Sequence, residues 1–260
     1  MDIALYQVDA FASEVFKGNP AAVCPLDRWL DDATMQAVAF ENNLSETAFF
    51  VSEADGFRIR WFTPLAEVAL CGHATLASAH VLFTEIPGSR DTVTFSSLSG
   101  LLRVERRRDL LAMNFPSQPP VPADPPRLLF EALGGNPVAY LQGADHLVVY
   151  ESEEEIAALT PRMDLLMQTG LRGVIVTAPG RSCDFVSRFF APGLGIDEDP
   201  VTGSAHCELV PYWSRRLGRT ELHAVQVSRR MGELFCVDLG DRVEISGRAV
   251  TYLRGTVSLP

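Results

Sequence analysis

The sequence predicts an α/β (α+β) protein of two similar domains, each a curled β-sheet around one central helix. The first observation behind this prediction is an internal repeat, because one succession of strand, loop and glycine-started helix occurs in both halves of the chain. The second is that short alternating segments outnumber helical ones elsewhere, which favours sheets wrapped around few helices.

The repeat is clearest where each helix is expected to begin. Phe62-Thr63-Pro64 aligns with Phe190-Ala191-Pro192, and Cys71-Gly72-His73-Ala74 aligns with Thr202-Gly203-Ser204-Ala205. The loop between the two blocks is three residues longer in the second half. We therefore expect two domains of one topology, joined near the proline-rich stretch 116–126, with residues 1–116 in the first and 117–260 in the second.

The individual elements follow from periodicity. Strands are expected, in chain order, over 4–11, 48–51, 58–64, 92–95, 110–115, 173–177, 184–192, 225–228 and 242–245. A helical stretch is expected over about 32–41. A second helix, over about 72–86, is apolar on nearly every side, which is typical of an enclosed helix. A third is expected over about 203–217, where Pro211 should kink or interrupt it.

Composition excludes several classes of function. The 260 residues carry a formal net charge of −11 and a single lysine, Lys17, so no basic stripe can neutralise a phosphate backbone, and we expect no nucleic-acid partner. The N-terminal residues lack a signal-peptide pattern, and no apolar run reaches membrane-spanning length, so we expect a cytoplasmic protein without a membrane partner. The five cysteines contain no C-x-x-C pair, which favours free thiols and argues against a structural zinc site.

The two glycine-containing helix starts are candidate anion sites. A helix N-terminus presents unpaired amides and about half a positive charge, so two facing N-termini can bind one carboxylate. The alternative is that Gly72 and Gly203 only begin helices that Thr75, Thr202 or Ser204 cap. The repeated context favours binding.

Glu46, His73 and Asp199 are the candidate proton carriers. Glu46 stands where a helical stretch gives way to an apolar strand, and entry into apolar surroundings is expected to raise its pKa. The alternative is a solvated acid at a strand end. His73 and Asp199 each stand at a helix start, where they either converge on the same site or act as caps.

Cys71 and Thr202 occupy matching places in the repeat. A two-thiol epimerase needs an acid/base group on each face of its substrate, and only one thiol is present here, so Cys71 is equally a small buried residue. His206 and Cys207, inside the second repeated helix, are interpreted as packing residues.

These motifs together resemble a known family. The blocks that carry the resemblance are Asp9-Ala10-Phe11, Phe16-Lys17-Gly18-Asn19-Pro20-Ala21-Ala22-Val23, Ser45-Glu46-Thr47-Ala48-Phe49, Cys71-Gly72-His73-Ala74-Thr75 with Glu67 ahead of it, and Gly195-Ile196-Asp197-Glu198-Asp199-Pro200-Val201-Thr202-Gly203-Ser204-Ala205. In order and content they are similar to the PhzF-like (phenazine biosynthesis-like) family. The resemblance implies the diaminopimelate epimerase-like fold, a site in the cleft between the halves, neither cofactor nor metal, and a homodimer.

The resemblance also implies roles for individual residues. Glu46 would be the general acid/base, with His73 and Asp199 handling protons or orienting the substrate. Gly72, Gly203 and Ser204 would hold the substrate carboxylate, with Ser45 and Thr202 beside them.

Three functions remain open from the sequence. The leading one is a cofactor-independent isomerase that moves a proton on a small carboxylate, of the trans-2,3-dihydro-3-hydroxyanthranilate type. The second is an amino or imino acid racemase or dehydratase that uses Cys71 and Thr202. The third is a non-catalytic ligand-binding or interaction protein that keeps the fold.

Overall fold

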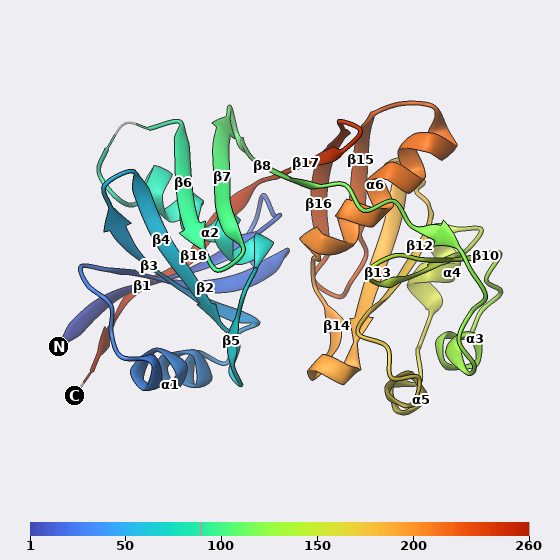
Figure 1. Ribbon diagram of the computed structural model, residues 1–260, viewed down its shortest axis with the longest axis horizontal. Coiled ribbons are helices and arrows are strands. Elements are labelled where there is room, and N and C mark those ends of the chain that lie inside the picture. The colour runs from blue at the N-terminus through green and yellow to red at the C-terminus, as the bar shows by residue number, and fades with distance from the viewer. Residues whose placement is uncertain (89, 260) are drawn as a thin grey trace. The chain divides into compact units, whose positions relative to one another are not determined.

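The chain divides into two compact units, which are coloured along the sequence in Figure 1. The computed structural model describes residues 1–88 and 90–259. Unit 1 comprises Met1–Asn114 and Ser246–Pro260, and unit 2 comprises Phe115–Ile245. The sequence placed the end of the chain with the second half, whereas the structure groups it with the first.

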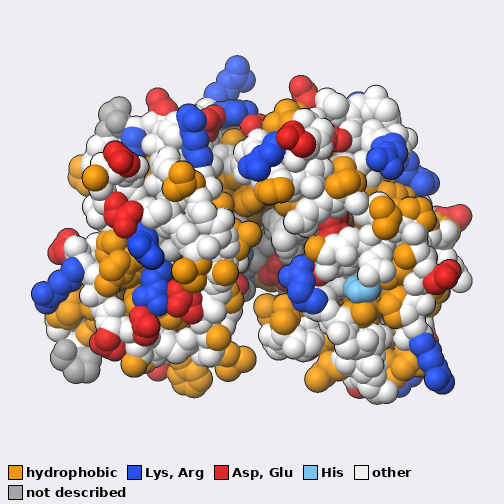
Figure 2. Space-filling view, in the orientation of Figure 1, with side chains coloured by type: hydrophobic (Ala, Val, Ile, Leu, Met, Phe, Trp, Pro, Cys, Tyr) orange, Lys and Arg blue, Asp and Glu red, His pale blue; other side chains and the backbone are white. Residues whose placement is uncertain are grey.

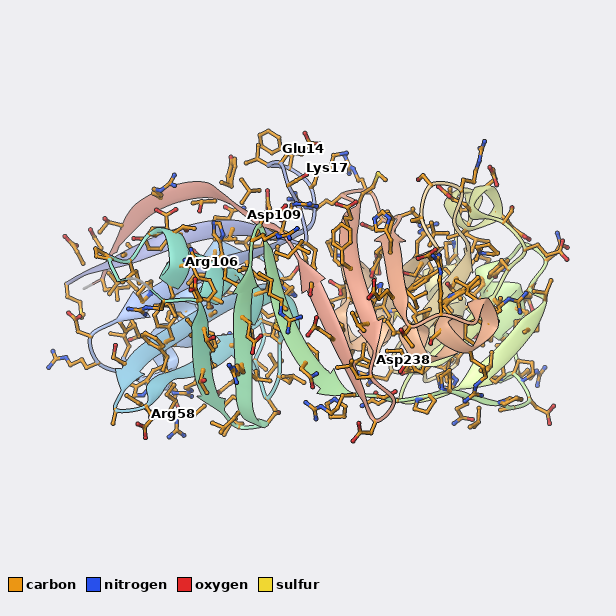
Figure 3. The ribbon with its side chains drawn as sticks, turned by 90° about the horizontal axis from the view of Figure 1, so that it is seen from above. Glu14, Lys17, Arg58, Arg106, Asp109 and Asp238 are labelled. Atoms are coloured by element: carbon orange, nitrogen blue, oxygen red, sulfur yellow. The ribbon has the colours of Figure 1, made fainter. Side chains whose placement is uncertain are left out.

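Strand pairing explains why the end of the chain belongs to unit 1. Strand β18 (Ala249–Ser258) runs antiparallel to β1 (Asp2–Ala10) over the length of both strands. Arg248 adds an ion pair, its Nε donating at 2.7 Å to Asp109. Asp109 lies in the turn that follows β7 and is labelled in Figure 3. A return of this kind leaves no local periodicity signal, so the sequence alone did not reveal it.

Unit 1 contains one sheet in the order β18-β1-β2-β3-β4-β6-β7-β8. The β2–β3 and β4–β6 pairs are parallel and the other pairs are antiparallel, while the short β5 lies beside β4. The bounds are β2 Asn19–Leu26, β3 Glu46–Glu53, β4 Gly56–Phe62, β5 Glu67–Val68, β6 Thr92–Ser97, β7 Gly100–Arg107 and β8 Leu110–Pro116.

Unit 2 contains strands in the order β9-β10-β11-β12-β13-β15-β16. Here β11–β12 and β13–β15 are the parallel pairs, and the short β14 lies beside β13. The bounds are β9 Val121–Pro122, β10 Ala139–Gln142, β11 His146–Val149, β12 Val174–Pro179, β13 Phe185–Ala191, β14 Ile196–Asp199, β15 Glu221–Gln226, β16 Gly232–Asp238 and β17 Arg242–Gly247.

The two units therefore repeat one topology. The succession parallel, antiparallel, parallel, antiparallel runs through β2-β3-β4-β6-β7 and again through β11-β12-β13-β15-β16. The crossover of the second parallel pair contains α2 (Gly72–Thr84) in unit 1 and α6 (Gly203–Leu217) in unit 2. The predicted fold class and its duplication are confirmed.

Helix α2 is enclosed, as its sequence predicts. It contacts β1, β2, β3 and β18, and from His73 through Ala79 every side chain is buried. The helix ends at Thr84, two residues short of the expected end, with Glu85 as its C-cap.

Helix α6 runs through Pro211 without interruption, so the predicted break is wrong. A proline removes the amide that would bond to the carbonyl four residues earlier, here that of Cys207. The amide of Gln118 donates to that carbonyl at 3.0 Å instead. The linker thus supplies the hydrogen bond that the proline removes.

The remaining helices cover the sheets. In unit 1, α1 (Asp32–Asn42) has Asp31 as its N-cap, and the Asp31 carboxylate accepts from the Thr34 amide. Unit 2 contains α3 (Leu129–Leu133), α4 (Glu153–Ala158), α5 (Met163–Gln168) and the 3-10 turn η1 (Pro192–Leu194). Each unit has its own apolar core, around Met35 and Phe49 in unit 1 and around Val176 and Phe190 in unit 2.

The surface mixes charges of both signs. On the face drawn in Figure 2, acidic side chains lie beside basic ones on both units. Within residues 1–88 and 90–259, no helix has the length and apolarity needed to cross a membrane.

Candidate functional site

Glu46, Cys71 and His73 meet inside unit 1. Glu46 opens β3, Cys71 is the N-cap of α2, and His73 stands two residues further along the helix. His73 Nε2 lies 3.1 Å from Glu46 Oε2, and His73 Nδ1 lies 3.5 Å from Cys71 Sγ. The His73 side chain is 8% exposed and that of Glu46 is 13% exposed, so the contacts form in nearly water-free surroundings.

The fold brings these residues together through α2 and β3. Glu46 lies opposite Ala21 in the parallel β2–β3 pair, and the chain reaches β3 from α1 through Asn43, which adopts the left-handed conformation. Helix α2 packs against β2 and β3, which holds its first turn close to this region of the sheet.

The charges of Glu46 and His73 stabilise each other. Burial alone would raise the pKa of Glu46, but the His73 charge and hydrogen bonds from His73 and Cys71 outweigh burial and lower that pKa. Burial would lower the pKa of His73, yet its two partners raise that pKa well above the ordinary value. The pair is therefore carboxylate and imidazolium at neutral pH, and the predicted upward shift of the Glu46 pKa is wrong because the sequence did not reveal the adjacent imidazole.

Cys71 is a protonated thiol in this arrangement. Burial raises its pKa to about 11, and the Glu46 charge adds to the effect. A thiol with this pKa is a poor base at neutral pH, although its contact with His73 keeps it within reach of a proton.

Within the part of the chain that the structure describes, these three side chains form a group whose donor types suit a metal ion, since their ligand atoms all lie within 4.8 Å of one another. Each of the three groups can also carry a proton, and the contacts of His73 with Glu46 and with Cys71 allow proton transfer between imidazole and carboxylate or thiol.

The first turn of α2 has amides that no side chain caps. Cys71, the N-cap residue, makes no capping hydrogen bond. Thr75 was a candidate cap, but its hydroxyl donates to the Cys71 carbonyl at 2.6 Å instead. Amides at a helix start can bind an anion.

The equivalent turn of α6 has the same arrangement. Its N-cap residue, Thr202, has backbone angles φ −115° and ψ 99°, close to the φ −145° and ψ 106° of Cys71, and it too makes no capping bond. Gly203 is half-buried and Ser204 is exposed. The Thr202 hydroxyl donates to Asp199 Oδ2 at 2.5 Å, so the predicted Asp199 and Thr202 lie together in unit 2.

Gln226 positions this turn and was not predicted from the sequence. Its Oε1 accepts from the Thr202 amide at 2.9 Å, and its Nε2 donates to the Asp199 carbonyl at 2.8 Å and to Thr202 Oγ1 at 3.1 Å. The side chain is fully buried at the end of β15. A lone glutamine in a strand gives no signal of this role.

His206 makes a further contact that the packing interpretation missed. Burial lowers its pKa to about 4, so the ring is neutral, and Nδ1 donates to the Thr202 carbonyl at 2.8 Å. Thr75 makes the same bond in unit 1, and both residues stand four positions after the N-cap. Extending the repeat alignment by one residue would have paired them.

The structure thus groups the predicted residues by unit. Ser45, Glu46, Cys71, Gly72 and His73 are neighbours in unit 1, and Asp199, Thr202, Gly203 and Ser204 are neighbours in unit 2.

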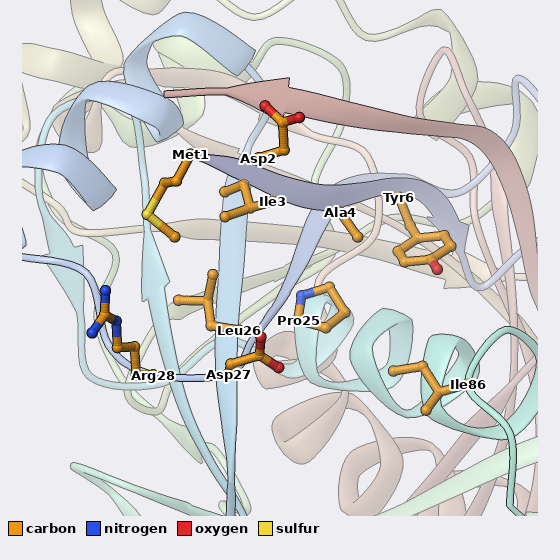
Figure 4. Close-up of a pocket in the computed structure, with 10 residues that line it drawn as sticks. All are labelled: Met1, Asp2, Ile3, Ala4, Tyr6, Pro25, Leu26, Asp27, Arg28 and Ile86. Carbon is orange, nitrogen blue, oxygen red and sulfur yellow. The ribbon is translucent and has the colours of Figure 1, made fainter. Parts of the chain in front are cut away.

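A surface cavity of about 620 Å³ in unit 1 lies elsewhere (Figure 4). It reaches Pro25 and Leu26 at the end of β2, whereas Glu46 pairs near the beginning of that strand. Five strand residues separate the two places, or roughly 16 Å. This cavity does not belong to the candidate site.

Two duplicated units of one topology, each with a helix that follows a glycine-containing turn, give an epimerase-like α/β fold. The fold matches a hydroxyproline epimerase from Agrobacterium vitis with a TM-score of 0.62 over 99% of this chain and 93% of that one, at 10% identity. The chain belongs to the phenazine biosynthesis-like (PhzC-PhzF) family, whose model matches residues 8–255.

Relatives over the full length support this assignment. Two proteins of Pseudomonas aeruginosa, each named an uncharacterized isomerase, are 52% and 53% identical, with all of this chain and all of each relative covered. The crystal structure of a PhzF-family protein from Enterococcus faecalis superposes with a TM-score of 0.98 at 48% identity, covering 100% of both chains. The chain is an isomerase of this family, as the sequence predicted.

Proposed function

We propose that the protein is a cofactor-independent isomerase that moves a proton on a small carboxylate-bearing substrate, with Glu46 as the general acid/base. One observation carries the proposal: a nearly buried carboxylate lies 3.1 Å from an imidazole on the first turn of an uncapped helix. Glu46 is ionised at neutral pH, so it can accept a proton without first losing one.

In this mechanism Glu46 takes a proton from a carbon next to an electron-withdrawing group and returns it to another carbon. The intermediate is an enolate-like anion. The His73 imidazolium and the first-turn amides of α2 stabilise the developing negative charge, and they are in place before the reaction begins.

The second helix start would hold the substrate. The amides of Gly203 and Ser204 and the Ser204 hydroxyl are suited to a carboxylate, and Asp199 with Thr202 to a polar substituent. Gly72 and Ser45 would contact the substrate from unit 1. The best chemical match for the proposed substrate is a trans-2,3-dihydro-3-hydroxyanthranilate-like acid.

The proposal extends to where and in what form the enzyme works. Action without a metal or cofactor, in the cytoplasm and as a homodimer, belongs to the proposal through the family resemblance.

A racemase or dehydratase that uses Cys71 and Thr202 is the second candidate. The contact between Cys71 Sγ and His73 Nδ1 favours it, because an imidazole can carry a thiol proton. The raised pKa of Cys71 weighs against it. Cys71→Ser separates the two: the Glu46 mechanism predicts less than about a tenfold loss of turnover, whereas a thiol base predicts a loss of about 10²-fold or more.

The test is proton NMR in deuterated water with a panel of dihydro-hydroxyanthranilate, amino and hydroxy acids. We expect Glu46→Gln to lower deuterium incorporation and isomerisation by about 10³-fold, within the range seen when a general base is removed. Glu53→Gln, at the exposed other end of β3, is the matched control and should retain wild-type rates.

Retention of exchange by Glu46→Gln would overturn the mechanism. Binding of a panel acid without exchange in the wild type would instead favour the non-catalytic alternative for that acid.

A further inference from the structure

In each unit, the loop that leads into the helix start is held by an arginine–glutamate ion pair with the same two-bond geometry. In unit 1, Arg60 Nε and Nη2 donate to the two carboxylate oxygens of Glu67, each at 2.7 Å. In unit 2, Arg188 donates to Glu198 through the same two nitrogens at 2.7 and 3.0 Å. We call each two-bond pair an Arg–Glu clasp.

The two clasps occupy equivalent positions in the duplicated fold. Arg60 lies on β4 and Arg188 on β13, each two residues before a phenylalanine of the sequence repeat. The guanidinium groups lie 5.1 Å from the Phe62 ring and 4.9 Å from the Phe190 ring.

The acidic partners match as closely. Glu67 precedes the N-cap Cys71 by four residues, and Glu198 precedes the N-cap Thr202 by four residues. The three extra residues of the second loop lie before Glu198, so the distance along the chain from clasp to helix is the same in both units.

Each clasp fixes the short strand that precedes the helix. Glu67 is on β5 and Glu198 is on β14, and both strands make few ladder contacts with their neighbours. A two-bond arginine–carboxylate pair fixes orientation as well as distance, so it can define the path of such a short strand.

Other bonds anchor the arginines. Arg60 Nη1 donates to Asp32 at 2.8 Å. Arg188 Nη1 donates to the carbonyls of Ile156 and Leu159 at 3.0 and 2.8 Å. The side chains of Arg60 and Arg188 are only 20% and 12% exposed, which limits their motion and the screening of their charge.

We infer that Arg60 with Glu67, and Arg188 with Glu198, are positioning residues that set the two helix N-termini for the reaction. The first clasp sets the turn that contains Cys71 and His73. The second sets Asp199, the residue directly after Glu198, together with Thr202. This inference rests on the proposed function, since it assigns the turn of α2 to proton transfer and the turn of α6 to substrate binding.

The test compares Arg60→Lys and Arg188→Lys with Arg254→Lys. Lysine keeps the charge but cannot form the two-bond fork. Arg254 makes an equivalent fork to Glu85, at 2.8 and 2.7 Å, but Glu85 is the C-cap of α2, about 20 Å from the helix start. It is therefore a control of matched chemistry.

We expect a split in the kinetic parameters. Arg60→Lys should lower kcat about tenfold with KM within about threefold, because the turn it positions carries His73. Arg188→Lys should raise KM about tenfold with kcat within about threefold, because its turn carries binding groups. Arg254→Lys should change neither by more than about twofold.

A readout that needs no substrate separates this inference from the proposed function. The imidazole of His73 is titrated by NMR, with His73→Asn used to assign its signal. Arg60→Lys should move the His73 pKa relative to the wild type, and Arg254→Lys should not.

Wild-type His73 titration in Arg60→Lys, or kinetics for both clasp variants that match those of Arg254→Lys, would overturn the inference. Failure of the proposed function shows separately, as turnover retained by Glu46→Gln. Should a lysine variant not fold, Glu67→Gln and Glu198→Gln keep the side-chain shape, and the same split is expected of them at smaller size.

Discussion

The start of α2 and the start of α6 share a backbone and differ in chemistry. Both begin at an uncapped residue followed by glycine, both have a side chain four residues on that bonds the N-cap carbonyl, and both follow an Arg–Glu clasp. Unit 1 adds a buried carboxylate, an imidazolium and a thiol, whereas unit 2 adds hydroxyls and Asp199. The two units thus repeat the backbone of the helix start but place different side chains beside it.

The largest expected effect comes from substituting the residue that occupies the same helix position in each unit. We expect His73→Asn to lower kcat/KM by about 10² to 10³-fold, because it removes the charge beside Glu46 and beside the developing anion. Ser204→Ala, its counterpart in α6, should lower kcat/KM by only about tenfold, as loss of one hydrogen bond from a hydroxyl to a carboxylate does. Steady-state kinetics on the substrate found by the exchange panel would measure both, and equal losses would contradict the division of roles.

A smaller effect is expected from the bond that follows each N-cap. Thr75→Val keeps the shape but removes the donor to the Cys71 carbonyl, which still accepts the Thr75 amide at 3.1 Å. We expect the free energy of unfolding to fall by about 1 kcal/mol, since no buried carbonyl is left unpaired. Urea denaturation measures this change, and a loss above about 3 kcal/mol would show that the hydroxyl has another role.

The smallest expected effect is that of pH on kcat/KM between pH 4.5 and 6.5, which are the ordinary pKa values of glutamate and histidine. The Glu46 pKa lies below that window and the His73 pKa lies well above it, so the reactive charge pair persists across it and kcat/KM should stay nearly constant. In His73→Asn the burial of Glu46 is no longer offset by a charge, so the acid limb should move to higher pH. A bell-shaped wild-type profile centred in this window would contradict the paired charges.

The pKa shifts of Glu46 and His73 also make the stability of the fold depend on pH. The depressed pKa of Glu46 adds stability that is present above its unfolded value and is lost as pH falls through the folded value. The raised pKa of His73 adds stability that is present below pH 6.5 and is lost as pH rises through its folded value.

The sequence predicted the features that depend on local residue patterns. Apolar periodicity located α2, and the repeat located both glycine turns and the candidate residues beside them. The predicted interruption of α6 at Pro211 was wrong. The carbonyl that loses its helical hydrogen bond accepts instead the amide of Gln118, which is far away in the chain.

Features that depend on tertiary neighbours were not predicted. The direction of the Glu46 pKa shift depends on an imidazole 27 residues later in the chain, and Gln226 reaches Thr202 only because β15 ends beside it. The Arg–Glu clasps had a signal, the shared spacing of four residues before each N-cap, but that spacing becomes meaningful only once the strands are paired.

The return of β18 to β1 has a consequence for synthesis of the chain. Strand β1 is among the first residues made, yet its partner on one side emerges only after all of unit 2 has been translated. At 5 to 20 residues per second, residues 115–245 take roughly 7 to 26 s. At the end of that interval unit 2 is complete while the sheet of unit 1 still lacks its last strand, so the inserted unit can fold before the unit that contains Glu46.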